Sequence, residues 1–223
     1  MRHLLHSTIL ASTLGFLLCE TAKAESPFYV RTALGPAIAE DITLTKGFEG
    51  NKASVDYGAS FGLAGGWQVS RWLGLELETG AIYTHLDRLY DEDVVFENYS
   101  AHSSLLNVPV TANLVFRYQP KDSRWSGYLK GGLGGTAGRL SMSPSSEGGA
   151  YGDGTDWDFV PAYRAGIGVG YRVSKRWTLE LGYELFGNGS SEWNIRDDEG
   201  DPLRVGFDPI RVHSFQFACK FQF

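Results

Sequence analysis

Apolar residues alternate with polar or small residues over most of the chain. Between positions 57 and 70, the odd positions include Tyr57, Phe61, Leu63 and Trp67, whereas the even positions carry only small or polar residues. This period of two is typical of a β-strand whose two faces meet different surroundings. Such stretches predict strands over residues 28–39, 57–70, 73–83, 106–118, 125–138, 161–173, 177–185 and 215–223.

The segments between these eight strands alternate in length. Short turns join three pairs of strands, at 70–71, 119–124 and 174–176. The other connections are long and polar, at about 40–56, 87–103, 139–158 and 188–208. Short turns at one end and long loops at the other are typical of a transmembrane β-barrel. The sequence therefore predicts an all-β fold, an eight-stranded antiparallel up-and-down barrel with short periplasmic turns and long extracellular loops.

The chemistry of the two strand faces indicates which face meets lipid. One face is apolar, and the other carries the charged residues and many of the 28 glycines. A soluble lipocalin-like barrel or a β-sandwich would turn the apolar face inward, but a surface facing water has no need of so many glycines. The lumen of an eight-stranded barrel does, because its interior only just holds side chains. We therefore expect the apolar face to meet lipid.

Aromatic residues gather near the predicted short turns, where the interfacial girdle of a membrane barrel belongs. Pro109 fits this barrel poorly, because a proline removes a hydrogen-bond donor from a ladder that has no free edge. We expect a bulge or a strand end near it. The predicted girdle residues are Trp67, Tyr118, Trp125, Tyr171 and Trp177.

The first 24 residues have the pattern of a cleaved secretory signal peptide. A basic start is followed by a short apolar stretch and by the small-x-small cleavage site Ala22-Lys23-Ala24. An uncleaved anchor and a lipoprotein at Cys19 are the alternatives, but the apolar stretch is short for a membrane span and a large residue precedes Cys19. We expect a signal peptide over 1–24 and one barrel domain over 25–223.

Taken together, these features resemble the small eight-stranded outer-membrane barrels of the OmpA/OmpX type. The resemblance covers residues 25–223 and implies export to the cell outer membrane. In that family, a C-terminal strand ending in Phe is read by the outer-membrane assembly machinery, which is therefore an expected partner. Members differ in activity, so the resemblance implies no single function. The aromatic residues of the final strand are Phe215, Phe217, Phe221 and Phe223.

The polar strand face places charged residues of both signs inside the predicted barrel. Basic and acidic residues nearly balance there, as mutual pairing requires, so we expect a salt-bridged lumen that is closed. An ion pathway is the alternative. The expected network contains Arg31, Glu76, Glu78, Arg117, Lys130, Arg164, Arg172, Glu180, Glu184 and Lys220. Within it, the four glutamates are expected to pair with Arg117, Arg164, Arg172 and Lys220.

The predicted loops at 87–103 and 188–208 are acidic, and the formal net charge of the chain is −6. This charge argues against a nucleic-acid partner. The acidic residues do not have the spacing of an EF-hand loop, so solvated loops are favoured over a divalent-cation site or a partner-binding surface. The expected partners are outer-membrane lipid, lipopolysaccharide and an extracellular ligand of the loops.

The sequence contains no residue pattern that predicts catalysis. His213 and Ser214 are neighbours on one strand, so they point to opposite faces and cannot act as base and nucleophile. We recognise no hydrolase, metal or phosphate-binding motif, and expect no catalytic residue, cofactor or metal. The predicted function is a non-enzymatic outer-membrane barrel in envelope structure or surface interaction and adhesion. A narrow channel for small solutes or ions is the alternative, and a lipid A-modifying enzyme is less favoured.

Overall fold

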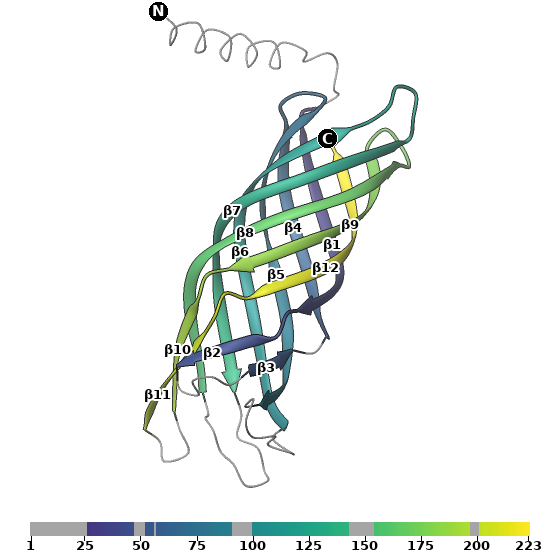
Figure 1. Cartoon of the computed structure of the whole chain (residues 1–223). Coiled ribbons are helices and arrows are strands. Elements are labelled where there is room, and N and C mark those ends of the chain that lie inside the picture. Colours follow the sequence, from purple (N-terminus) through teal and green to yellow (C-terminus); the bar gives the residue numbers. More distant parts are fainter. Residues whose placement is uncertain (1–25, 47–51, 56, 91–99, 143–153, 197–200) are drawn as a thin grey trace, which may run out of the picture.

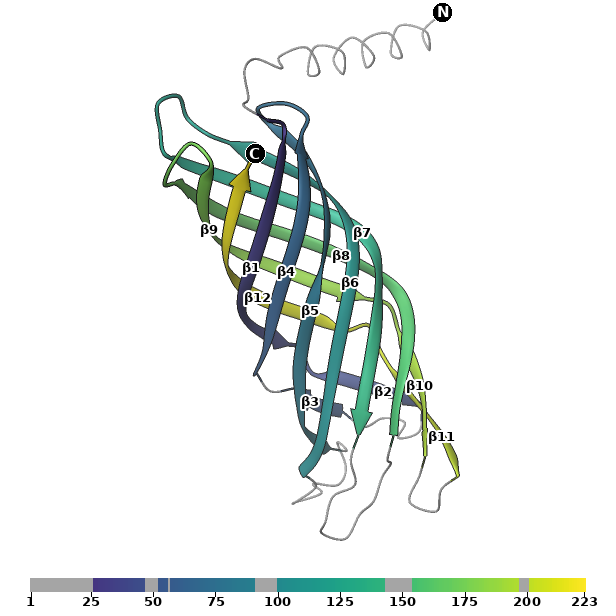
Figure 2. The ribbon, with the colours of Figure 1, turned by 180° about the vertical axis from the view of Figure 1, so that it is seen from behind.

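A closed barrel of eight long strands forms the body of the molecule (Figure 1). The computed structural model describes residues 26–46, 52–55, 57–90, 100–142, 154–196 and 201–223, so the expected signal peptide lies outside the described residues. Neighbouring strands pair antiparallel, and β1 pairs with both β4 and β12, which closes the sheet (Figure 2). The long strands are β1 Phe28–Ala39, β4 Tyr57–Gln68, β5 Leu73–Tyr90, β6 Ser100–Tyr118, β7 Trp125–Met142, β8 Gly154–Arg172, β9 Trp177–Asn188 and β12 Arg211–Gln222. The predicted eight-stranded antiparallel barrel is confirmed.

Short strands extend the barrel at the end opposite the C-terminus (Figure 1). Strand β10 pairs with β11, β11 with β2, β2 with β3, and β3 with β5. The bounds of these strands are β2 Ile42–Lys46, β3 Lys52–Val55, β10 Ser191–Arg196 and β11 Pro202–Phe207. The predicted loops are therefore too wide: strands occupy part of 40–56, 87–103, 139–158 and 188–208, because alternation of apolar and polar residues continues into them.

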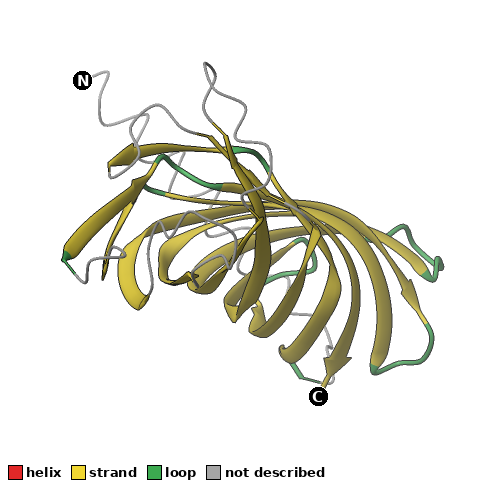
Figure 3. Ribbon diagram, turned by 90° about the horizontal axis from the view of Figure 1, so that it is seen from below, coloured by secondary structure: helices red, strands yellow, loops and turns green. Residues whose placement is uncertain are grey.

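The outer wall of the barrel is apolar. Leu77, Ile167 and Leu181 point outward and are 59–63% exposed, whereas their neighbours in sequence point inward. Along β4, the exposed Trp67 and Tyr57 are ten residues apart. At ~3.3 Å per residue and a strand tilt of ~40°, this distance spans about 25 Å across the membrane, which is the height of the apolar band of a membrane barrel. Among the described residues, no helix is long and apolar enough to cross a membrane (Figure 3).

Two tyrosine rings occupy the lumen beside inward-facing glycines. A Cβ added to Gly66 would lie 2.1 Å from the Tyr29 ring, and one added to Gly182 would lie 2.2 Å from the Tyr128 hydroxyl. Any side chain at these two positions would displace a ring. The narrow lumen thus requires glycine there, as the argument from barrel width expects.

The inward face becomes apolar toward the end that carries β2, β10 and β11. Trp193 of β10 is fully buried there, its ring packs edge-on against Phe207 at 5.1 Å between centroids, and its indole N–H donates to the Gly138 carbonyl at 3.1 Å. We call this group the mouth cluster. Sequence reasoning missed it by treating the inward face as polar throughout. Its members are Ala37, Ala39, Ile42, Leu44, Ile82, Leu105, Leu140, Ala162, Phe186, Trp193, Ile195, Val205, Phe207, Ile210 and Val212.

Pro109 lies inside β6 without the expected bulge or strand end. The β6–β7 register runs unbroken past it. Toward β5, Thr79 pairs with Val110 and Ile82 pairs with Asn107, so the register is the same on both sides of the proline. The expectation is wrong because the ladder omits the pairings around the proline and does not insert a residue.

Leu181→Arg should lower the free energy of unfolding by about 2–4 kcal/mol, because it places a charge on the lipid-facing wall near the middle of the apolar band. Denaturant unfolding of the protein in lipid vesicles measures this loss. Ser190→Arg is the control, since Ser190 is exposed beyond the end of β9, and its effect should stay within about 0.5 kcal/mol. Equal losses at the two positions would contradict the orientation of the wall.

Candidate functional site

A network of buried ion pairs fills the part of the lumen nearer the short turns. Glu78 lies 2.7 Å from Lys130 Nζ and 3.0 Å from Arg164 Nη1. The same two cations contact Glu184 at 2.5 and 2.6 Å. All four side chains are at most 4% exposed. Each cation is therefore shared by two carboxylates, and each carboxylate by two cations.

Arg31 joins this group to a third carboxylate. Its Nη1 lies 3.9 Å from Glu78, and its Nε donates to Glu180 Oε2 at 2.9 Å. Arg117 Nη1 donates to the other oxygen of Glu180 at 2.7 Å. The network is therefore continuous across the lumen and does not consist of separate pairs.

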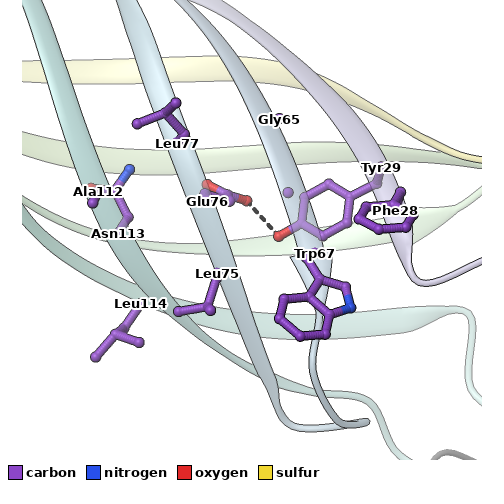
Figure 4. A pocket seen from close by; sticks show the side chains of 11 residues that line it. Phe28, Tyr29, Gly65, Trp67, Leu75, Glu76, Leu77, Ala112, Asn113 and Leu114 are labelled. Carbon is purple, nitrogen blue, oxygen red and sulfur yellow. Dashed lines mark hydrogen bonds between the residues drawn. The ribbon is translucent and has the colours of Figure 1, made fainter.

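Glu76 and Lys220 lie in the lumen but outside these ion pairs. The Tyr29 hydroxyl donates to Glu76 Oε1 at 2.9 Å (Figure 4), and Lys220 Nζ lies 4.8 Å from the centroid of the same ring. Within the described part of the chain, neither residue has an oppositely charged group within 4 Å. The expected ion pairs of Glu76 and Lys220 are wrong, because the Tyr29 ring lies between them and serves both.

Arg172 does not belong to the lumen network. It is exposed at the end of β8, and its Nη2 donates to the Ser123 carbonyl in the next turn at 3.0 Å. The expectation for Arg172 is wrong because strand alternation predicts which face of the sheet a side chain lies on, but not its position along the barrel axis. The last inward position of β8 lies beyond the enclosed lumen.

The inward positions of β6 show how the lumen changes along its length. Asn113 donates to Glu78 at 3.1 Å. The next inward residues include Thr111 and Asn107, which are buried and neutral, and after them comes Leu105 of the mouth cluster. Along β6, a charged layer, a neutral polar layer and an apolar layer thus follow one another toward the end of the barrel that carries β2, β10 and β11.

Carboxylates of β8 hold the hairpin β10–β11 over the barrel. Asp158 accepts the backbone N–H of Glu192 at 2.9 Å, and Asp156 accepts that of Asn194 at 2.8 Å. We call these two contacts the β8 latch. They satisfy backbone groups on the edge of β10 that faces away from β11. The hydrogen bond from the Asn194 N–H lowers the pKa of the Asp156 carboxyl.

The predicted girdle residues lie on the outer wall near the short turns. Trp67 and Tyr118 are exposed, and Tyr171 is half-buried against Trp125 at 5.0 Å between ring centroids. Trp177 is exposed and packs against Phe221 at 4.8 Å. Sequence reasoning missed Trp72, which stacks on Tyr118 at 5.6 Å, because it lies in a turn and not in a strand. The exposed aromatic residues at the C-terminal end are Phe215 and Phe217 of β12 and Phe223, which directly follows β12.

A hydrogen-bonded group on the outer wall includes His213. Its Nδ1 lies 2.6 Å from the Tyr183 hydroxyl, and its Nε2 lies 3.1 Å from Glu40 Oε1. Ser214 is buried on the inner face, so these two neighbours point apart as expected. The contact between Tyr183 and His213 could not be predicted from the sequence, because β9 and β12 are adjacent only in the folded sheet. In the described ranges, no three His, Cys, Asp or Glu residues are grouped to hold a metal.

Residues 8–223 match a sequence family described as "Outer membrane protein beta-barrel domain". The chain belongs to this family. The barrel is therefore an outer-membrane protein, and its apolar outer wall meets lipid. No curated protein sequence matches the chain significantly.

Solved structures of other outer-membrane proteins share the fold. Neisserial surface protein A is 16% identical over 90% of this chain and 100% of its own, with a TM-score of 0.54. OprG from Pseudomonas aeruginosa is 15% identical over 89% and 97%, with a TM-score of 0.57. The outer membrane protease OmpT from Escherichia coli is 10% identical over 92% and 99%, with a TM-score of 0.51. At such identities the likeness shows the fold alone, and this fold includes an enzyme.

Glu180→Gln should lower the free energy of unfolding by about 3–5 kcal/mol, since it leaves two buried guanidinium groups without their carboxylate. Adding Arg117→Gln should recover part of the loss, because the two residues are in contact. Denaturant unfolding in detergent micelles measures both effects. Arg172→Gln is the matched control and should cost less than about 0.5 kcal/mol. A loss at Arg172 as large as that at Glu180 would disprove the network described here.

Acid should loosen the β8 latch. Because its pKa is lowered in the folded protein, Asp156 contributes stability that is present above the ordinary carboxyl pKa of ~4 and is lost as the pH falls through its lower, folded value. Amide hydrogen exchange of Asn194, corrected for the intrinsic effect of pH, should speed up over that range. Asp156→Asn should weaken the protection already at neutral pH, whereas Asp208→Asn should not. Protection that is independent of pH would contradict the latch.

Proposed function

We propose that this outer-membrane barrel is a closed, non-enzymatic protein that acts in envelope structure or surface interaction through its extracellular end. The observation that supports this proposal best is the filling of the lumen by a charged layer and an apolar layer, with neutral polar residues between them. A solute crossing the barrel would first meet the shared ion pairs and then the mouth cluster.

The two layers oppose transport for different physical reasons. Removing one side chain from the ion network leaves a buried charge unpaired, which is costly, so the network resists rearrangement by a passing ion. The mouth cluster is apolar, and its largest side chains, Trp193, Phe186 and Phe207, are each at most 2% exposed. An ion entering it would lose its hydration without gaining polar contacts. The barrier to solutes in the lumen therefore does not depend on a single gating residue.

The hairpin β10–β11 offers a surface for interactions outside the cell. Its buried side chains Trp193, Ile195, Val205 and Phe207 belong to the mouth cluster. Its exposed side chains include the charged Glu192, Arg196 and Arg204. Glu192 contacts Lys46 of β2 at 2.5 Å and Arg204 of β11 at 3.8 Å, so charged groups link three strands on this surface. A surface built on ordered strands loses little conformational entropy when a partner binds.

We propose three classes of partner for the protein. An extracellular ligand would bind the charged outer end, and outer-membrane lipid with lipopolysaccharide would surround the wall. The assembly machinery would engage β12, whose exposed phenylalanines support this role. The net charge of −6 argues against nucleic acid as a partner.

The unmodified protein should give no steady conductance in planar lipid bilayers, because both layers of the lumen must be displaced for an ion to pass. A refolding check by gel migration of boiled and unboiled samples accompanies the measurement, since closed barrels often resist detergent until heated. Selective conductance that Glu180→Gln abolishes without loss of stability would favour the channel. A changed lipid A mass spectrum on overexpression would instead favour the enzyme.

A further inference from the structure

The short turns at the periplasmic end carry a basic surface that the lumen network does not use. In the described turns and the adjoining strand ends, six basic side chains are exposed, against a single acidic side chain, Asp122. The excess is notable in a chain whose formal net charge is −6. We call this surface the basic rim. Its residues are Arg71, Lys121, Arg124, Arg172, Lys175 and Arg176.

Two apolar grooves lie on the outer wall, next to part of this basic rim. The first has a volume of about 520 Å³ and lies across β1, β4, β5 and β6 (Figure 4). Gly65 lines it, and a Cβ added there would have no atom within 4 Å, so the missing side chain leaves open space. The outward side chains around it are Phe28, Trp67, Leu75, Leu77, Ala112 and Leu114.

The second groove has a volume of about 380 Å³ and lies on the other side of β6. Gly127 lines it, and the nearest atom to a Cβ added there would be the Gly168 carbonyl oxygen at 4.0 Å. β6 contributes to both grooves, through Leu114 in the first and Phe116 in the second. The outward side chains of the second groove are Trp72, Phe116, Tyr118, Leu129 and Ile167.

Cationic groups of the rim lie at the periplasmic ends of these grooves. Arg71 directly precedes Trp72, and its guanidinium carbon lies 4.8 Å from the centroid of that ring. Trp67 of the first groove pairs with Leu75 next to the same turn. Tyr118 and Gly127 of the second groove pair next to the turn that carries Lys121 and Arg124. Positive charge therefore lies where the headgroup of a membrane lipid would be, and apolar grooves lie where its chains would be.

We propose that the two grooves and the adjoining part of the basic rim bind one anionic phospholipid of the inner leaflet. One acyl chain lies in each groove, with β6 between them, and the phosphate lies between Arg71 and the turn of Lys121 and Arg124. Charge complementarity selects an anionic headgroup over a zwitterionic one, because the basic side chains of the described turns outnumber the acidic ones and a neutral headgroup gains little from this excess. The site depends on the membrane orientation of the barrel and not on its surface function.

Spin-labelled lipids test the choice of headgroup. Phosphatidylglycerol and phosphatidylcholine with the same labelled chain are compared in phosphatidylcholine vesicles that contain the protein. The protein should immobilise phosphatidylglycerol preferentially, and the triple variant Arg71→Gln/Lys121→Gln/Arg124→Gln should lower this preference by about fivefold for each cation removed. Salt at about 0.5 M should lower the preference of the unmodified protein. The control is Lys175→Gln/Arg176→Gln, which changes the third turn, away from the grooves, and should retain the preference.

Groove-filling variants test where the chains lie. Gly65→Leu and Gly127→Leu fill the two grooves without a predicted clash and should each reduce the immobilised fraction for both headgroups. Gly131→Leu is the matched control, because a Cβ added at Gly131 also has no atom within 4 Å but lies outside both grooves. Gel migration before and after boiling establishes that each variant folds. An unmodified protein without headgroup preference, or equal effects of Gly131→Leu and the groove variants, would overturn the proposal.

Discussion

Pairing of β1 with β12 closes the sheet, and this closure determines what the inner wall can contain. An eight-stranded barrel leaves an interior only just wide enough for side chains. Two tyrosine rings already fill much of it, so residues facing them, such as Gly66 and Gly182, have no side chain. A charged group placed in this space has little access to water. Most such groups contact a counter-charge on another strand of the same wall, whereas Glu76 and Lys220 contact the Tyr29 side chain.

The ion network satisfies this requirement by sharing. Glu78 and Glu184 both contact Lys130 and Arg164, and Arg31 bridges from Glu78 to Glu180. Shared contacts let a few residues neutralise one another from opposite sides of the lumen. Charge neutralisation is more complete than hydrogen bonding, because Arg117 Nε and Arg164 Nε and Nη2 are buried without a hydrogen-bond partner among the described residues. The same contacts connect β1, β5, β7, β8 and β9, so the side chains reinforce the order that the backbone ladder imposes.

The sequence predicts much of the barrel, because a period of two is a local property that survives in each strand. It assigns inward and outward faces correctly for Glu78, Glu180 and Leu181. It does not predict the position of a side chain along the barrel axis or its bonding partner, since both depend on how the strands are staggered around the closed sheet. Arg172 and Glu76 show the consequence: both have the inward phase, yet one lies outside the lumen and the other bonds to a tyrosine. The hairpin that contains Trp193 was predicted as a loop, because polar residues surround Trp193 in the sequence.

The β8 latch holds the outer hairpin by its main chain. Asp158 accepts the N–H of Glu192 and Asp156 that of Asn194, whereas the side chains of Glu192 and Asn194 are exposed. The anchoring hydrogen bonds therefore do not require particular side chains at those positions, except that proline has no N–H to donate. Mutation can alter the chemistry displayed to the outside while the support beneath stays the same.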